Sequence, residues 1–303
     1  MENNLLAIVI PYYKIKYFQK TLEGLKNQTC KNFSLYIGDD ASPDSPLSIL
    51  YEYENVLPHH YTRFEENWGM KKLVAQWERC IDLSAEEPWI MILGDDDEVD
   101  CCFVENFYKH LENIEKNNIQ VVRFASCNID EKGSLLSKIY VNPSFEKAKD
   151  SLIRTAKGEG RSTLSEHVFS RKAYLKHRFK DFPVAFGSDN VAWLEFPEFG
   201  DIYSINESVV RIRISPEHLS STHDEAIRYQ RRKGVYVFIK YIIKNYYHHF
   251  DTEEREILLK KAYRSLRYYS RSKKKAAKFV FFMMKYIRMI IGILNKNRKK
   301  TSF

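Results

Sequence analysis

Few features of this chain point to a secreted or disulfide-linked protein. The cysteines are too few and too irregularly spaced for a metal site or a disulfide framework, and two are adjacent: Cys30, Cys80, Cys101, Cys102 and Cys127. No signal peptide is expected, because MENNLLAIVIPYY has an acidic start and an apolar run only as long as a strand. No internal repeat occurs, and the only low-complexity segment is SKKKAAK. We therefore expect reduced thiols in a cytosolic protein.

Acidic residues are absent after Glu256, whereas fifteen lysines or arginines lie between Lys260 and Lys300. Without those fifteen, 33 basic residues stand against 40 acidic ones, so the net charge of +8 arises from the end of the chain. This asymmetry excludes a protein that is basic throughout and indicates an acidic body attached to an anionic surface. A hydrophobic content of 44% excludes bulk disorder.

Strand-like and helix-like segments alternate over residues 5–126. The pattern predicts strands at 5–10, 33–38, 59–64, 89–93 and 119–126. It predicts helices between them at 16–28, 46–54, 70–83 and 101–117. Such repeated units are typical of an α/β protein with a mostly parallel, twisted sheet and helices on both faces. Beyond residue 224 the pattern is helical and rich in aromatic and basic residues.

Polar residues follow three of the predicted strands directly: Tyr12, Tyr13, Asp39, Asp40 and Asp95 to Asp97. Ligands of parallel sheets collect beyond the carboxyl ends of the strands, so we expect these residues to share one rim. The three aspartates in ILGDDDEVD (92–100) repel one another, and a group of opposite charge must compensate them. Mg²⁺ or Mn²⁺ suits this role, because it takes one or two carboxylates together with water and substrate phosphates. A helix N-cap near Asp100 is the alternative, but it explains one aspartate rather than three.

Four segments, AIVIPYYK, LYIGDDASPD, ENWG and ILGDDDEVD, resemble in order and spacing the family 2 glycosyltransferases, which have the GT-A fold. The resemblance covers about residues 5–220. It implies that Tyr13 stacks near a nucleobase, that Asp39 bonds the base edge, and that Asp97, together with Asp96, binds the metal. The implied nucleotide-sugar site comprises Pro11, Tyr13, Asp39, Asp40, Asn67, Asp95, Asp96 and Arg213.

The sequence departs from the family pattern at several positions. Lys14 replaces the usual Asn, and Ala41 replaces a Gly. KKLVAQWERC (71–80) stands where Ala-Arg-Asn often follows. In the next family motif, Ser188 occupies the usual Glu position. These departures leave room for a glycosyltransferase-like protein that has lost catalysis.

Inverting sugar transfer needs a carboxylate that removes the proton of the acceptor hydroxyl. The resemblance implies that FGSDNVAWLEF (186–196) carries this base, and we predict Asp189 for the role. A helix starting at Asn190 would make Asp189 its N-cap, which is the alternative or an additional role. Three other carboxylates in the region are rivals: Asp181, Glu195 and Glu166.

VVRIRISPEHLSS (209–221) resembles a family segment that follows the base. Arg213, Ser215 and His218 are candidates there for contact with the diphosphate or the acceptor, and a plain loop is the alternative for each. Two tryptophans are candidates for sugar-stacking walls, although a buried Trp more often belongs to the core: Trp68 and Trp193.

The polar residues of KKKAAKFVFFMMKYIRMIIGILNKNRKK (273–300) recur on one helical stripe, and apolar residues fill the rest. The 16 residues between Lys278 and Asn295 are interrupted by two charges, whereas a membrane span needs about 20 apolar residues. We therefore expect an in-plane helix at about 272–300 on an anionic membrane surface. A helix docked on its own domain or on a dimer partner is the alternative. Nucleic acid is not expected, because the basic residues accompany aliphatic bulk.

Together these inferences predict a GT-A domain at 1–222, with a nucleotide-binding half (1–100) and an acceptor half (101–222), and a helical extension at 223–303. The expected activity is metal-dependent, inverting sugar transfer from a UDP-linked donor to a saccharide or lipid-linked acceptor in surface polysaccharide assembly. The expected location is the cytoplasmic face of the cell membrane. The sequence is compatible with a monomer and with an oligomer. The alternatives are a non-catalytic binding module and a sugar-phosphate nucleotidyltransferase. A nucleotidyltransferase would need a Gly-rich loop after the first strand, and PYYKIKY at this place contains no Gly.

Overall fold

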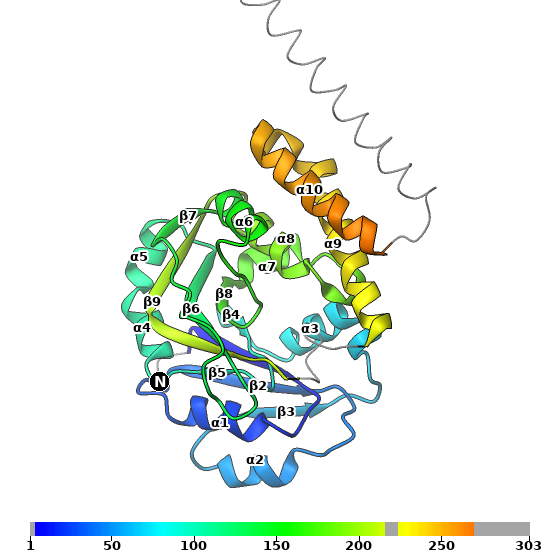
Figure 1. The fold of residues 1–303 in the computed structure, drawn as a ribbon. Coiled ribbons are helices and arrows are strands. Elements are labelled where there is room, and N and C mark those ends of the chain that lie inside the picture. Colours follow the sequence, from blue (N-terminus) through cyan, green and yellow to red (C-terminus); the bar gives the residue numbers. More distant parts are fainter. Residues whose placement is uncertain (1–3, 216–223, 270–303) are drawn as a thin grey trace, which may run out of the picture.

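A computed structural model describes residues 4–215 and 224–269 of the chain. The strands form one curled, mixed sheet in the order β3-β2-β1-β4-β8-β6-β9-β5, with β7 paired to β9 (Figure 1). Their bounds are β1 Leu6–Tyr12, β2 Phe33–Asp39, β3 His60–Arg63, β4 Trp89–Ile92, β5 Glu98–Val99, β6 Val121–Ile129, β7 Phe145–Lys147, β8 His167–Ser170 and β9 Asp201–Arg213. The longest pairings, β1 with β2 and β6 with β9, are parallel, so the predicted mostly parallel α/β sheet is confirmed.

Helices cover both faces of this sheet, as predicted. Three short 3-10 turns join them: η1 Gly69–Lys71, η2 Pro183–Ala185 and η3 Tyr247–His249. The helices are α1 Phe18–Lys26, α2 Leu47–Tyr53, α3 Leu73–Ile81, α4 Phe103–Lys109, α5 Leu111–Lys116, α6 Ala148–Lys157, α7 Arg171–His177, α8 Ser188–Glu195, α9 Glu225–Tyr246 and α10 Thr252–Tyr269.

The central strand β1 explains the layers, because its side chains alternate between two cores. Leu6, Ile8 and Ile10 pack against α1, α2, α4 and α5 on one face. Ala7 and Val9 pack on the other face, in the core that also holds side chains of α3 and α6 to α10. Burial on both faces requires the continuous apolar run that the sequence has there.

The helices after residue 224 belong to the second of these cores. Phe238 and Ile242 of α9 are buried with Val191 and Trp193 of α8, and α10 adds Leu258. Gly234 permits this close approach, since a Cβ on it would lie 2.9 Å from the carbonyl oxygen of Pro183. Across the two described ranges, no helix combines the length and the hydropathy needed to cross a bilayer. The expected tail helix at 272–300 and His218 lie outside the described residues.

Candidate active site

The carboxyl ends of β1, β2 and β4 form one rim, as the strand order predicts. Asp95, directly after β4, accepts hydrogen bonds at Oδ2 from the backbone N–H groups of Tyr13 and Lys14 after β1, both at 2.7 Å. Asp40, after β2, donates its own N–H to the carbonyl of Tyr12 at 3.0 Å. Pro11 lies opposite Gly38 in the β1–β2 register, one residue before this rim. The three loops are therefore joined by direct contacts.

Asp97 is held from two distant parts of the chain. Its Oδ2 accepts a hydrogen bond from Ser165 Oγ at 2.5 Å, and its Oδ1 accepts one from the backbone N–H of Arg213 at 3.0 Å. Asp96 and Asp97 are both buried. A side chain at Gly94 would collide with this pair, because a Cβ there would lie 2.8 Å from Asp97 Oδ2.

The aspartate cluster carries more negative charge than its surroundings compensate. Burial and, to a lesser extent, the neighbouring charge of Asp96 together raise the pKa of Asp95 to about 7, against the backbone hydrogen bonds from Tyr13 and Lys14. Burial also raises the pKa of Asp97 to about 6, although the hydrogen bonds from Ser165 and Arg213 oppose this shift. A carboxylate with a raised pKa is stabilised by an added cation, so the donor set fits a hard divalent ion.

The aspartates fit a divalent cation that completes its coordination shell with oxygen atoms of water or of a bound ligand. Among the described residues, no group of three or more His, Cys, Asp or Glu side chains is arranged to hold a metal by itself. A site of one or two carboxylates plus water and phosphate oxygens is the usual arrangement for Mg²⁺. The helix-cap alternative does not account for Asp95 to Asp97, because α4 begins at Phe103. It applies at most to Asp100, whose Oδ1 accepts the N–H of Cys102 at 3.3 Å in the turn before that helix.

Asp39 organises the turn after β2. Its Oδ1 accepts the N–H of Ser42 and its Oδ2 accepts Tyr61 Oη and Arg63 Nη1, each at 2.7 Å. Burial raises the pKa of Asp39, but these hydrogen bonds outweigh it and leave the pKa below its ordinary value. Asp39 is therefore ionised at neutral pH, at the base of the rim. Above it the ring of Tyr13 is 42% exposed, as a stacking surface must be.

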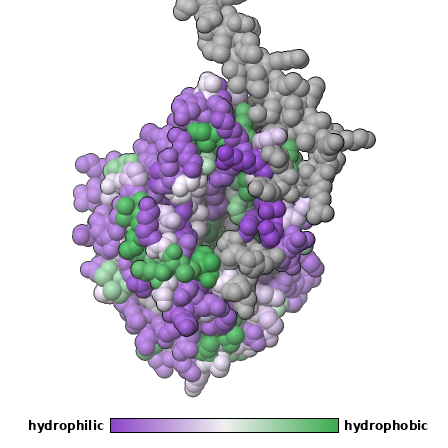
Figure 2. All heavy atoms as spheres, viewed as in Figure 1, coloured by the Kyte–Doolittle hydropathy of each residue, from purple (hydrophilic) through white to green (hydrophobic). Residues whose placement is uncertain are grey.

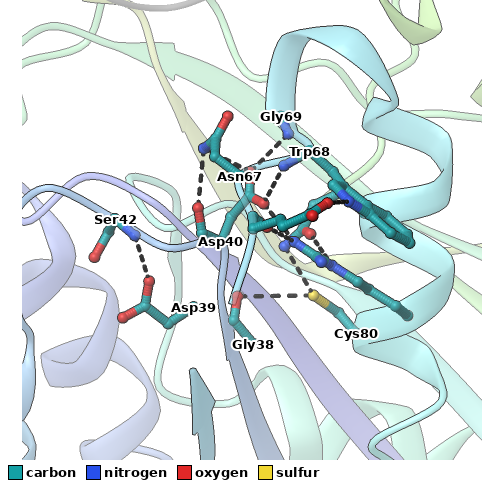
Figure 3. Close-up of polar contacts among 11 residues, drawn as sticks. Gly38, Asp39, Asp40, Ser42, Asn67, Trp68, Gly69 and Cys80 are labelled. Carbon is teal, nitrogen blue, oxygen red and sulfur yellow. Dashed lines mark hydrogen bonds and ion pairs between the residues drawn. The ribbon is translucent and has the colours of Figure 1, made fainter. Parts of the chain in front are cut away.

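Asp40 holds the loop of the ENWG segment (Figure 3). Its carboxylate accepts hydrogen bonds from the backbone N–H groups of Trp68 and Gly69, both at 2.7 Å, and from Asn67 Nδ2 at 3.1 Å. Arg79 Nη2 completes the set at 2.5 Å. Asp40 is buried, so its role in this structure is to position the 67–69 loop beside the rim.

Arg79 is a residue that sequence reasoning missed. Its guanidinium lies 3.9 Å from the ring centroid of Phe64 and 4.2 Å from that of Trp68, between the two rings. Trp68 thus packs on a cation and is not a free sugar-stacking wall. Trp193 stacks on His167 with ring centroids 4.2 Å apart and is buried, which confirms the core alternative for it.

Asp189 lies in the first turn of α8, half-buried. The expected N-cap role is wrong, because the helix begins at Ser188, two residues earlier than expected, and Gly187, with φ of 95°, is its N-cap. A Cβ on Gly187 would lie 2.3 Å from the ring of Phe238, so α9 fixes the start of α8. Burial raises the pKa of Asp189 to about 6, while the side chain of Asn190 donates to it at 2.9 Å.

The rival carboxylates have other partners or environments. Glu195 accepts hydrogen bonds from Tyr241 and Tyr246 at 2.7 and 2.6 Å and pairs with Lys180, which ties α8 to α9. Glu166 is buried and accepts the hydroxyl and the backbone N–H of Thr163. The third rival, Asp181, is exposed. Of the four candidates, Asp189 combines partial access with a pKa near neutrality.

The guanidinium of Arg213 is not exposed for the expected direct contact with a diphosphate. It is 1% exposed, and Nε and Nη1 donate to the carbonyls of Asp96 and Asp130 at 3.1 and 2.7 Å. Its Nη2 pairs with Glu98. These partners use the guanidinium within the protein, so Arg213 supports the aspartate loop from below. Ser215 is buried as well.

A pocket of about 530 Å³ opens beside the loop that Asp40 holds. Apolar side chains line it together with two lysines, one aspartate and one glutamine: Met70, Lys71, Leu73, Asp181, Phe182, Pro183, Val184, Ala185, Ala226, Ile227, Gln230 and Lys233. The lining therefore suits a ligand that has both apolar and hydroxyl or anionic groups. No sequence motif pointed to this pocket, because η1, η2 and α9 come together only in the folded chain.

Residues 7–177 match the protein family described as glycosyl transferase family 2. The chain belongs to this family. The match covers more than half of the sequence and includes the β1, β2 and β4 ends that build the rim. The predicted membership of family 2 and the GT-A fold are therefore confirmed. No curated protein sequence is significantly similar to the chain.

Solved structures of similar fold include S. aureus TarS 1–349 in complex with UDP-GlcNAc, with a TM-score of 0.63 and 15% identity over 86% of this chain and 72% of that one. TarS 1–349 in complex with UDP gives 0.60 and 14% over the same shares. S. aureus TarS itself gives 0.57 and 16%, with 89% of this chain and 44% of that one covered. At these low sequence identities, the similarity to TarS shows that the two proteins share a fold.

Three further side chains at the site have no motif of their own. Ser165 bonds Asp97, Arg63 bonds Asp39, and the charge of Arg161 lowers the pKa of Asp97. Arg63 could have been suspected from its place at the end of a predicted strand beside the second motif. Ser165 and Arg161 lie in an irregular segment whose path the sequence pattern does not indicate.

Proposed function

We propose that this family 2 glycosyltransferase transfers a sugar, with inversion, from a UDP-linked donor to a saccharide or lipid-linked saccharide acceptor. The observation that carries the proposal is the rim at which Tyr13, Asp39 and the Asp95–Asp97 cluster meet. The two TarS complexes, with UDP and with UDP-GlcNAc, support a uridine nucleotide as the donor class.

The donor's nucleoside occupies the open side of the rim in this proposal. The exposed ring of Tyr13 stacks on the base. The carboxylate of Asp39 is fully buried and accepts the backbone N–H of Ser42, so in this proposal it bonds the base edge once the turn that carries Ser42 has moved aside. The loop of Asn67, held by Asp40, closes the side toward the donor sugar.

Asp97 and Asp96 would hold a divalent cation, Mg²⁺ or Mn²⁺, which neutralises the diphosphate that leaves with the nucleoside. Asp95 keeps the aspartate loop in register with β1 through the backbone of Tyr13 and Lys14. Arg161 lies near enough to act on the charge of Asp97 and adds positive potential on the same side.

Asp189 acts as the base. A carboxylate removes a proton most effectively when its pKa lies near the working pH, and the pKa of Asp189 is raised to about 6 by burial. The carboxylate accepts the proton of the acceptor hydroxyl while that oxygen bonds the anomeric carbon. The pocket beside η1 and η2 suits the acceptor, because its lining offers apolar surface as well as Lys71 and Lys233.

We propose further that the basic segment at 272–300 attaches the enzyme to the cytoplasmic face of the membrane, where surface polysaccharides are assembled on lipid carriers. The sequence pattern of that segment is the support for this location.

A panel of nucleotide sugars, with and without Mn²⁺, tests the donor and the metal together. We expect one UDP-sugar to raise the melting temperature only when Mn²⁺ or Mg²⁺ is present, since a bound ligand stabilises the fold. The same donor should be hydrolysed or transferred. Binding without any turnover would identify a non-catalytic module instead, and pyrophosphate release from a nucleoside triphosphate and a sugar phosphate would identify a nucleotidyltransferase.

A further inference from the structure

The connection between β6 and β7 exposes an unusual amount of apolar surface. Four of its side chains and the first residue of β7 are 47% to 63% exposed and form what we call the apolar strip: Leu135, Leu136, Ile139, Val141 and Phe145. In Figure 1 the connection crosses the front of the molecule. Figure 2, in the same view, shows hydrophobic surface left of centre on this face. Several exposed large apolar side chains within one short segment of a folded protein mark a candidate interaction site.

The apolar strip is built on a hydrogen-bonded hairpin. Leu136 N–H donates to the carbonyl of Asn128 at 2.8 Å, and Tyr140 N–H donates to that of Ser126 at 2.8 Å. The hydroxyl of Ser137 accepts the N–H of Asn128 at 2.9 Å. These bonds pair the hairpin with β6, so the apolar side chains are carried on an ordered backbone.

The charged side chains of the hairpin differ in what they contact. Asp130 Oδ1 accepts the backbone N–H groups of Lys132 and Ser134, both at 2.8 Å, which turns this carboxylate back into the hairpin. Glu131 pairs with Lys16 at 2.7 Å. Lys132 and Lys138 are exposed, as Glu131 is, and Lys138 Nζ lies 5.6 Å from the ring centroid of Tyr140. With Lys16 counted, three basic side chains stand against Asp130 and Glu131, so the hairpin combines exposed apolar side chains with a small net positive charge.

The hairpin is attached to the active site. The carbonyls of Asp130 and Glu131 accept Arg213 Nη1 at 2.7 and 3.2 Å, and Arg213 N–H bonds Asp97. Glu131 also accepts the hydroxyl of Tyr17, in the segment that follows Tyr13. A surface that the apolar strip contacts therefore has a fixed position relative to the rim.

We propose that the apolar strip docks on an anionic lipid bilayer, with the five apolar side chains at the boundary of the headgroups and acyl chains and Lys132 and Lys138 on the lipid phosphates. Apolar side chains flanked by lysines match the chemistry of such a surface, which takes up aliphatic bulk and attracts positive charge. Acidic protein partners lack the apolar phase, and a neutral apolar partner leaves the lysines unpaired. The docking goes beyond the proposed function, because it orients the rim toward the membrane through the folded domain rather than through the basic tail.

Side-chain footprinting of the full-length protein tests the docking separately from the tail. Hydroxyl-radical labelling of residues 135–145 is measured with vesicles of phosphatidylglycerol and phosphatidylcholine (about 3:7), with phosphatidylcholine alone, and without vesicles. We expect the anionic vesicles to reduce labelling of the apolar strip at least threefold, and phosphatidylcholine to leave it unchanged. Labelling of 47–56, which carries exposed apolar residues elsewhere, should stay constant.

A matched pair of variants adds a quantitative readout. The strip variant, L135S/L136S/I139S/V141S, should lower partitioning onto the anionic vesicles by about tenfold. The control variant changes four equally exposed apolar residues elsewhere and should lower it less than twofold: L47S/Y51S/V56S/L175S. Circular dichroism checks that both variants fold.

Three results would overturn the docking: unchanged labelling of the apolar strip, an equal loss of partitioning in both variants, or protection that grows with protein concentration without vesicles. The last result would assign the strip to a second copy of the chain. Hydrolysis of the soluble donor reports on the active site alone, so a failure of the proposed function and a failure of the docking are distinguishable.

Discussion

Replacing Asp189 by Asn should abolish transfer while stabilising the fold. Burial raises the pKa of this carboxyl from 3.8 to about 6, so the ionised form is disfavoured in the folded state. A difference of that size corresponds to roughly 3 kcal/mol, of which the half-buried position retains about 1 to 3 kcal/mol. The neutral amide of the D189N variant avoids this cost. Loss of the base should slow transfer by about 10² to 10⁴-fold.

The pH dependence of the free energy of unfolding shows whether ionised Asp189 stabilises or destabilises the fold. The folded-state pKa lies above the unfolded value, so protonation of Asp189 stabilises the wild type as the pH falls through 6. The gain of D189N in the free energy of unfolding should therefore be full above pH 7, shrink to a small fraction at pH 4 and vanish below both pKa values. Wild-type kcat should fall below pH 6, where the base is protonated.

Urea unfolding of both proteins at pH 4, 6 and 8, together with transfer rates, measures these effects. Asp150→Asn serves as the matched control, because Asp150 is exposed on α6, away from the rim and the pocket, and should keep wild-type activity within twofold. The reasoning about Asp189 is refuted if D189N transfers sugar at the wild-type rate, or if it is less stable than the wild type at pH 8.

Three other substitutions test the parts of the site. Asp97→Ala should lower turnover at least 10²-fold and remove the effect of Mn²⁺ on the melting temperature; an unchanged Mn²⁺ response would contradict the metal assignment. Arg79→Ala leaves the buried Asp40 carboxylate without its ion pair and should cost about 3 kcal/mol in urea unfolding and raise the donor KM. Gly187→Ala has a positive φ and a clash with Phe238, so it should destabilise the fold by about 2 kcal/mol or more; a wild-type melting temperature would disprove the close packing of α8 on α9.

Much of the first half of the fold follows from local patterns. The predicted strands 5–10, 33–38 and 89–93 correspond to β1, β2 and β4 within two residues, because continuous apolar runs bounded by turn residues are a property of short segments. The helix expected at 101–117 is interrupted: it ends at Lys109 and resumes at Leu111, and the ring of His110 bonds the hydroxyl of Tyr203 on β9. That partner is invisible in the local pattern.

The sequence by itself determined the α/β class, the family and the rim, since each depends on motifs that follow strands in order. Only the tertiary structure decided what the rim residues contact. Asp97 meets Ser165 because β8 returns beside β4, and Arg213 lies beneath Asp96 because β9 pairs with β5 and β6. These contacts join residues about 70 to 120 positions apart. Their geometry depends on the order of strands in the sheet, which hydrophobic periodicity does not encode.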